Sequence, residues 1–171
     1  MNRGYHEIKE HGKREFPFNI YPCSIPVDFS HVALHWHEEM EIIAVKKGKG
    51  RITVDTVSYP VEEGDILAVF PGQLHAISCG NGERMEYENI IFRLSMLMGD
   101  NGDGCTVHFL KPLQEGQAKN PVLIQRNQPD HEVFGKVIQE LDRFSEIRGN
   151  GYQLAVKGQL FLFLYYSPLC N

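Results

Sequence analysis

The sequence lacks both a cysteine pattern and a long apolar run. Its four cysteines, Cys23, Cys79, Cys105 and Cys170, include no Cys-x-x-Cys pair, and this scatter favours free thiols in a reducing compartment. No stretch of about 18 apolar residues occurs, so no membrane span is expected. The first residues also lack the apolar segment of a signal peptide. We therefore expect a cytoplasmic protein.

The sequence also lacks an excess of basic residues. Lys and Arg number 17 against 22 Asp and Glu, which gives a formal net charge of −5. Proteins that bind a phosphate backbone directly use clustered positive charge, so direct DNA binding by this chain is not expected. The 171 residues, 42% hydrophobic and 23% charged, have the composition of an ordinary globular protein. They suffice for one domain, or for one domain with a helical appendix.

Short strand-like segments dominate residues 31–94. They are separated by Gly and Pro at intervals of about ten residues, a spacing typical of a β-sandwich or barrel. Residues 16–22 contain two prolines and are predicted as an edge strand, whereas the polar residues 1–15 are predicted as a flexible arm. The predicted strands of the main series are 32–37, 40–46, 51–55, 56–61, 66–70, 74–79 and 85–94, with turns at 47–50, 62–65 and 80–82, and 106–110 and 122–125 are predicted as last strands.

The hydrophobic period becomes helical after residue 127. Asp130 is a candidate N-cap, residues 149–151 form a glycine-rich stop, and a second helix is predicted from about 152 to 166. The end of that second helix is apolar on every side and must be buried against another surface. The apolar stripe of the first helix either covers the barrel or forms a dimer seam. We favour the seam, formed by Val133, Val137, Leu141 and Phe144.

Two histidines and a glutamate recur at alternate positions early in the β region. Because alternate side chains of a strand share a face, His35, His37 and Glu41 point the same way if the strand is unbroken. The Pro71-Gly72 turn can aim His75 toward them from a neighbouring strand. Three neutral imidazoles and one carboxylate suit zinc, nickel, manganese or iron. The alternative is a polar patch that lines a ligand pocket and requires no metal.

The spacing of these residues resembles a known pair of motifs. His-x-His-x3-Glu-x6-Gly ends at Gly48, and Gly-x6-Pro-Gly-x2-His runs from Gly64 to His75; together they resemble the paired motifs of the cupin superfamily. The resemblance implies a small antiparallel barrel or jelly roll. This sequence departs from the pattern at Phe29, Phe70 and Cys79, none of which is a metal-type ligand here, and the departures indicate a divergent branch.

A cupin barrel followed by two helices is similar to the N-terminal half of AraC-type transcription regulators. In that family the barrel senses a small molecule, and the helices dimerise the protein and lead into a DNA-binding half with two helix-turn-helix motifs. The resemblance implies that residues 1–125 are the ligand-sensing barrel with its arm. Residues 126–171 are then a helical dimerisation and linker segment. The DNA-binding half is absent from this sequence, so we expect a piece of a longer protein.

The function implied by the resemblance is a small-molecule-sensing and dimerisation domain, not an enzyme. It would act as a homodimer and contact DNA only through the absent half. A divalent metal is compatible with the site but not required. The alternative is a metal-dependent cupin enzyme of the dioxygenase or sugar isomerase type, against which the C-terminal helices count. Under the sensing interpretation the ligand-binding residues are His35, His37, Glu41 and His75, with Phe70, Ile43 and Val45 as lining.

Overall fold

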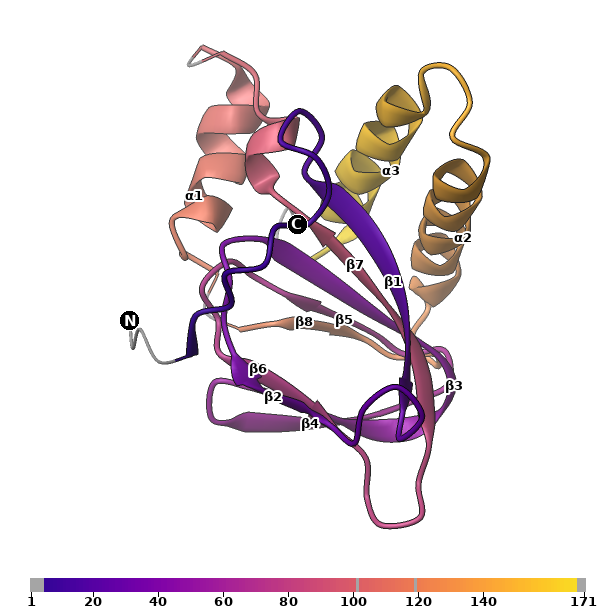
Figure 1. Ribbon diagram of the computed structural model, residues 1–171. Coiled ribbons are helices and arrows are strands. Elements are labelled where there is room, and N and C mark those ends of the chain that lie inside the picture. The colour runs from indigo at the N-terminus through magenta and orange to yellow at the C-terminus, as the bar shows by residue number, and fades with distance from the viewer. Residues whose placement is uncertain (1–4, 101, 119, 169–171) are drawn as a thin grey trace.

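The computed structural model describes residues 5–100, 102–118 and 120–168. Among these residues the chain forms an antiparallel sheet of eight strands rolled into a barrel, followed by helices (Figure 1). The strand order β1-β7-β3-β5-β8 makes one half, and β2, β6, β4 and the second half of β3 make the other. The barrel and trailing helices predicted from the sequence are confirmed. The strands are β1 Phe18–Ile25, β2 Val32–His35, β3 Met40–Val54, β4 Val57–Glu62, β5 Ile66–Val69, β6 His75–Ser78, β7 Met85–Phe92 and β8 Val122–Ile124.

Strand β3 is the longest strand and belongs to both halves of the barrel. Its first part pairs with β5 and β7, and its second part pairs with β4 and β6. The register shifts between Val45 and Lys47, and Gly48 follows with a φ of 79°, a conformation that favours glycine. The turn predicted at 47–50 is therefore wrong, because a bulge bends one continuous strand there. Residues 51–54 pair forward with β4 rather than back on the strand before them.

Alternation along β3 separates the apolar core into two clusters. Ile43 and Val45 point into the barrel, whereas Ile42 and Ala44 point toward the helices. The interior cluster comprises Ile25, Ile43, Val45, Ile52, Val54, Val61, Leu67, Val69, Ile77, Met85 and Tyr87. The outer cluster joins the other face of the sheet to the helices.

Both helices predicted at the C-terminal end are confirmed. They are α2, His131–Ile147, and α3, Tyr152–Tyr166, and they cover the face of the sheet formed by β1 and β7 (Figure 1). Asp130 occupies the N-cap position of α2, although its side chain makes no capping hydrogen bond. The strand predicted at 106–110 is wrong, because Thr106–Leu110 is helical and continues into α1, Lys111–Gln114. Of the two last strands predicted, the second is confirmed as β8.

The two long helices bury different fractions of their apolar residues. Val137 and Leu141, two of the four residues predicted as a dimer seam, are buried within the chain in the outer cluster. Val133 and Phe144 are half-buried. The apolar end of α3 was expected to be buried against another surface; Leu160, Phe163 and Leu164 are buried, yet one side of the helix stays uncovered in this chain, with Leu154 77% and Tyr165 63% exposed.

The described part of the N-terminal arm is docked on the barrel rather than flexible. The backbone N–H of Trp36 donates to the Tyr5 carbonyl, and the N–H of Glu7 donates to the Trp36 carbonyl, each at 2.9 Å. The His6 ring stacks on Trp36 with centroids 4.1 Å apart. Trp36 therefore packs on the arm. Residues 1–4 lie outside the described part of the chain.

Two expectations from composition can be compared with the structure. Cys23, Cys79 and Cys105 are free thiols, as predicted, and Cys170 lies outside the described residues. Within residues 5–168, apart from positions 101 and 119, we find no helix that is both long and apolar enough to span a bilayer.

Candidate functional site

The four side chains predicted to converge come from β2, β3, β6 and one loop. His35 ends β2 and pairs in register with His75, the first residue of β6. Glu41 is the second residue of β3, and His37 lies in the loop between β2 and β3. The strand expected to run unbroken through these positions is interrupted. Convergence survives because the N–H of Gly72 donates to the His37 carbonyl at 2.8 Å, which ties the loop to the turn before β6.

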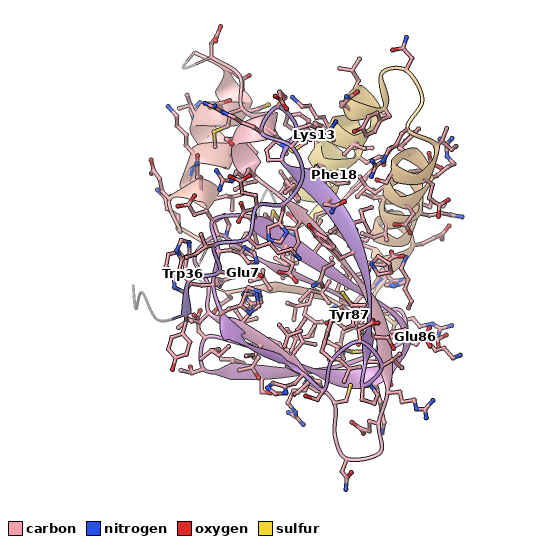
Figure 2. All side chains as sticks on the ribbon, in the orientation of Figure 1. Glu7, Lys13, Phe18, Trp36, Glu86 and Tyr87 are labelled. Atoms are coloured by element: carbon pink, nitrogen blue, oxygen red, sulfur yellow. The ribbon has the colours of Figure 1, made fainter. Side chains whose placement is uncertain are left out.

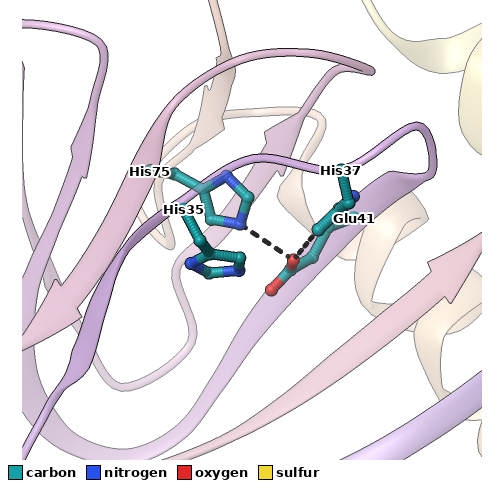
Figure 3. A group of neighbouring side chains, drawn as sticks. All are labelled: His35, His37, Glu41 and His75. Atoms are coloured by element: carbon teal, nitrogen blue, oxygen red, sulfur yellow. Dashed lines mark hydrogen bonds and ion pairs between the residues drawn. The ribbon is translucent and has the colours of Figure 1, made fainter. Parts of the chain in front are cut away.

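The polar group, as we call His35, His37, Glu41 and His75 together, is compact and almost fully buried (Figure 3). One ligand-type atom from each residue lies within 4.8 Å of those from the other three. The Nε2 atoms of His37 and His75 lie 2.9 and 3.2 Å from the same carboxylate oxygen, Oε2 of Glu41. Only His35 retains appreciable exposure, at 19% of its side chain. The described residues thus contain a group with the composition of a transition-metal site.

Main-chain carbonyls orient all three imidazole rings of the polar group. The Nδ1 atoms of His35, His37 and His75 lie 2.9, 3.1 and 3.0 Å from the carbonyl oxygens of nearby residues. Because a carbonyl oxygen only accepts, each Nδ1 carries a proton, and each neutral ring directs the Nε2 lone pair toward the centre. A nitrogen lone pair that faces a carboxylate oxygen is repelled unless a positive group lies between them. That group can be a proton on Nε2 or a metal cation. The donor set therefore fits a divalent metal.

Burial and mutual contact set the pKa values in the polar group. Burial alone would raise the pKa of Glu41, but hydrogen bonds and charge from His37 and His75 outweigh it and hold the pKa far below its usual range. Burial alone would lower the pKa of His75, but Glu41 raises it above its usual value. The pKa of His35 is lowered by burial and by its neighbour His75. Glu41 is consequently an anion that favours a cationic neighbour.

Further charged residues surround the polar group, and the sequence patterns did not single them out. Glu39 is buried, accepts a hydrogen bond from Arg93 Nε at 2.8 Å and lies 3.7 Å from His37 Nδ1. From the arm, Glu7 Oε2 lies 3.8 Å from His35 Nε2 and 3.6 Å from His11 Nε2. Glu39 lies between His37 and Glu41 at an alternate position of the same motif, so strand parity could have found it. The arm residues lie some 30 positions away, with no spacing signal.

The three apolar residues predicted as pocket lining lie on different faces of the sheet. Ile43 and Val45 belong to the interior cluster, on the same face of β3 as Glu41. Phe70 belongs to the outer cluster, and its neighbour Val69 points into the barrel in its place. The alternation of β5 explains this difference, because Val69 is the residue that pairs with Glu41.

Two cavities occur elsewhere on the described surface. One, of about 480 Å³, lies beside the second half of β3 and is lined by Lys49, Arg51 and Glu83 among others. The other, of about 840 Å³, lies between the arm, β1 and the helices, and its lining includes Phe16, Asp142 and Tyr152. The polar group lines neither of them, and the arm lies over it.

Comparison with protein families gives one match over most of the chain. The model of a family described as the AraC-like ligand binding domain matches residues 26–164. A curated relative, the uncharacterized HTH-type transcriptional regulator YdeC of Bacillus subtilis (strain 168), is 27% identical over 88 residues. That match covers 51% of this chain and 30% of the relative, so the chain spans under a third of the relative's length.

Similar solved structures include cupin proteins. A cupin protein from Bacteroides fragilis is 25% identical, with a TM-score of 0.37, over 50% of this chain and 70% of that protein. An oxalate decarboxylase from Bacillus subtilis with Mn(II) centers is 25% identical, with a TM-score of 0.34, over 37% of this chain and 18% of that enzyme.

Proposed function

Because this chain belongs to the family of AraC-like ligand binding domains, we propose that it is the effector-sensing domain of a transcription regulator and that the polar group is its recognition centre. The observation that carries the proposal is the convergence of three imidazoles and a carboxylate at a buried point of the barrel. A small polar effector needs a few fixed polar groups in an apolar surrounding, which the polar group and the interior cluster supply. Such a regulator acts in the cytoplasm.

A divalent transition metal is the proposed resident of the polar group. His35, His37 and His75 would hold it through Nε2 and Glu41 through a carboxylate oxygen. The metal, whether zinc, nickel, manganese or iron, would supply a positive anchor for oxygen atoms of the effector. The chain's own contribution is orientation: the carbonyl partners of Nδ1 fix the rings, and Glu39 with Arg93 supports the loop that carries His37.

The chain divides in this proposal into a sensing barrel, residues 1–125, and a helical segment, residues 126–171. Two of the polar contacts between them lie close to β5 and β3. His131 Nε2 donates to the Gly64 carbonyl at 2.6 Å, just before β5, and Lys46 on β3 pairs with Asp142 on α2 at 2.9 Å. Because β3 also carries Glu41, a change at the polar group can reach α2 along one strand and shift a population of helix positions.

We propose that the helical segment forms a homodimer through the uncovered side of α3. Val137 and Leu141 are buried in the chain, so a partner copy can contact them only if the helices separate. The exposed apolar residues of α3 offer a contiguous surface instead: Leu154, Phe161, Leu162, Tyr165 and Tyr166. Contact with DNA would come through a helix-turn-helix half, as the description of the curated relative suggests.

A metal-dependent cupin enzyme is the second candidate function. The observation in its favour is the same donor set, which could hold a catalytic metal. The family match favours the sensing domain.

One experiment separates the two functions. The chain, prepared without an affinity tag and loaded with Zn(II), Mn(II) or Fe(II), is mixed with panels of sugars, carboxylic acids and amines and followed by NMR. We expect chemical-shift changes for one class of compound and no new product signals over hours. Product formation with any metal would overturn the sensing proposal in favour of the enzyme. A chain that binds neither metal nor any panel compound would contradict both.

A further inference from the structure

The N-terminal arm brings a carboxylate to the open side of the polar group. Glu7 Oε2 lies 3.8 Å from Nε2 of His35, the most exposed ligand-type residue of the four. Figure 2 shows Glu7 beside Trp36, where the backbone of the arm pairs with the segment that follows β2. Glu7 itself is one-third exposed, so it is accessible and not locked in the core. Glu7 is not one of the four residues whose ligand-type atoms lie within 4.8 Å of one another; it lies beside His35 at the edge of that group and would have to move inward to bind a metal held there.

The arm also inserts a buried histidine beside Glu7. His11 is 4% exposed, and its ring centroid lies 6.0 Å from that of His37. Its Nδ1 lies 3.2 Å from the Tyr21 hydroxyl, but its Nε2 has no hydrogen-bond partner and faces Glu7 Oε2 at 3.6 Å. Buried nitrogens normally have a hydrogen-bond partner, so His11 Nε2 indicates that a polar atom is missing where the arm meets the polar group.

The charges of the polar group explain why a second carboxylate belongs there. Three neutral imidazoles, the Glu41 carboxylate and a divalent cation carry a net charge of +1. A single further carboxylate would neutralise that charge and could bind the metal beside the four protein ligands. Glu7 is the acidic side chain that the arm holds nearest to His35.

We propose that Glu7 is an exchangeable carboxylate ligand of the metal in the polar group, and that the effector is a small carboxylate which replaces Glu7 and releases the arm. The inference rests on the proposed sensing function and names its effector class. The exchange would replace one carboxylate–metal bond by another, with no change in protons or electrons. The arm thereby carries its own competitor for the effector.

The competition predicts how removal of Glu7 affects ligand binding. A tethered carboxylate acts at a high effective concentration, so a free carboxylate must outcompete it. In Glu7→Gln that competition is gone, and we expect a free carboxylate to bind roughly tenfold more tightly. Glu15→Gln is the matched control, because Glu15 is an exposed residue of the same arm.

The test uses propionate, which reproduces the end of a glutamate side chain, and propionamide as its neutral counterpart. Co(II)-loaded chain reports ligand exchange through its visible absorption spectrum. Zn(II)-loaded chain reports the arm through fluorescence of Trp36, the sole tryptophan, which is stacked on His6. We expect propionate, but not propionamide, to shift both signals in the wild type. Glu7→Gln should start from a different Co(II) spectrum and reach half-saturation at about one-tenth of the propionate concentration.

Three results would overturn the inference. Identical Co(II) spectra and half-saturation points for wild type and Glu7→Gln would show that Glu7 is not a ligand, while the metal centre itself stands. Equal responses to propionate and propionamide would reject the carboxylate class. Failure of the wild type to bind Co(II) or Zn(II) would reject the metal centre of the proposed function and this inference with it.

Discussion

Two regions differ in how far the chain covers them: the barrel mouth, by which we mean the polar group of His35, His37, Glu41 and His75, and the helical hairpin formed by α2 and α3. At the mouth, the arm of the same chain lies against the polar group; His75 of that group is fully buried, and His11 of the arm is 4% exposed. In the hairpin, α3 buries Leu160 but leaves Tyr165 63% exposed. A covered polar site suits a small ligand that displaces part of the chain, whereas an uncovered apolar surface suits another macromolecule.

In the described part of the chain, an ionic contact links the barrel to the helical hairpin. Lys46 on β3 lies 2.6 Å from Glu88 Oε2 on β7 and 2.9 Å from Asp142 Oδ2 on α2. Burial would lower the pKa of Lys46, but these two carboxylates outweigh it and the pKa is raised. Burial also raises the pKa of Glu88, which Lys46 opposes. Lys46 and Glu41 lie on the same strand, so β3 runs from the covered site to this contact with α2.

The largest effect is expected where the hairpin meets the barrel. Leu141 is fully buried, so Leu141→Glu places a charge in the outer cluster and should cost about 4 kcal/mol or more of unfolding free energy. Ile147→Glu on the same helix, at a position 64% exposed, should cost less than about 0.5 kcal/mol. Urea denaturation measures both. A stable, folded Leu141→Glu chain would mean that the helices pack differently from this structure.

The next effect concerns the mouth. His75→Ala removes a ligand-type nitrogen of the polar group and should weaken Zn(II) binding at least about 100-fold, since even outer partners of metal ligands contribute 10- to 100-fold. His31→Ala, at an exposed position, should leave the affinity unchanged. Isothermal titration of tag-free protein gives both constants. Equal affinities for the two variants would place the metal elsewhere.

The hairpin should respond to a surface change that leaves the mouth intact. Tyr165→Glu puts a charge on the uncovered side of α3 and should weaken dimerisation by roughly 10- to 100-fold, as loss of an interface anchor does. Gln153→Glu adds the same charge to α3 on a different side of the helix and should have little effect. Sedimentation over a range of concentrations distinguishes them. If both variants dimerise as the wild type does, the dimer interface lies outside α3.

Protons compete with a metal for the histidine nitrogens of the mouth, so metal binding there should depend on pH, whereas dimerisation through the apolar hairpin should not. The pKa of His75 is raised by Glu41, so the pair of these residues stabilises the metal-free fold below about pH 6.5, and that contribution is lost as pH rises through the raised pKa of His75. Metal binding must displace such protons. Zn(II) affinity should therefore fall as pH falls, by roughly tenfold per pH unit for each proton displaced. Titrations between pH 5 and 8 measure the slope; a flat profile would contradict Nε2 ligation.

Sequence alone could predict the polar group because its geometry follows from local rules. The alternate spacing singled out His35, His37 and Glu41 although the strand between them is interrupted, and the turn at Pro71-Gly72 precedes His75, which pairs with His35. Both helices were predictable from hydrophobic period. Residue spacing, turn residues and hydrophobic period are all set by residues close together in the sequence.

The parts that sequence reasoning missed depend on contacts between distant segments. Gly48 suggested a turn, but pairing of β3 with four other strands made it a bulge within one strand. Glu7 and His11 carry no periodic signal, since the arm has no regular structure and is placed by its pairing with Trp36. The burial of α2 likewise depends on its packing against both α3 and the sheet. The apolar stripe of a single helix does not show how many neighbours will cover it.

The smallest effect tests the ionic contact between the two regions. Lys46→Met leaves Glu88 and Asp142 facing each other and should cost about 1 kcal/mol of unfolding free energy at pH 7, a modest value because the Lys46 side chain is 38% exposed. The cost should be smaller at pH 5, because the raised pKa of Glu88 lets that carboxyl take up a proton and relieve the repulsion. Lys49→Met, which removes an exposed pairing with Glu83, is the control and should change little. If the variant at position 46 also alters Zn(II) affinity while the control does not, the mouth and the hairpin are energetically coupled through β3; unchanged affinity would mean that they work independently.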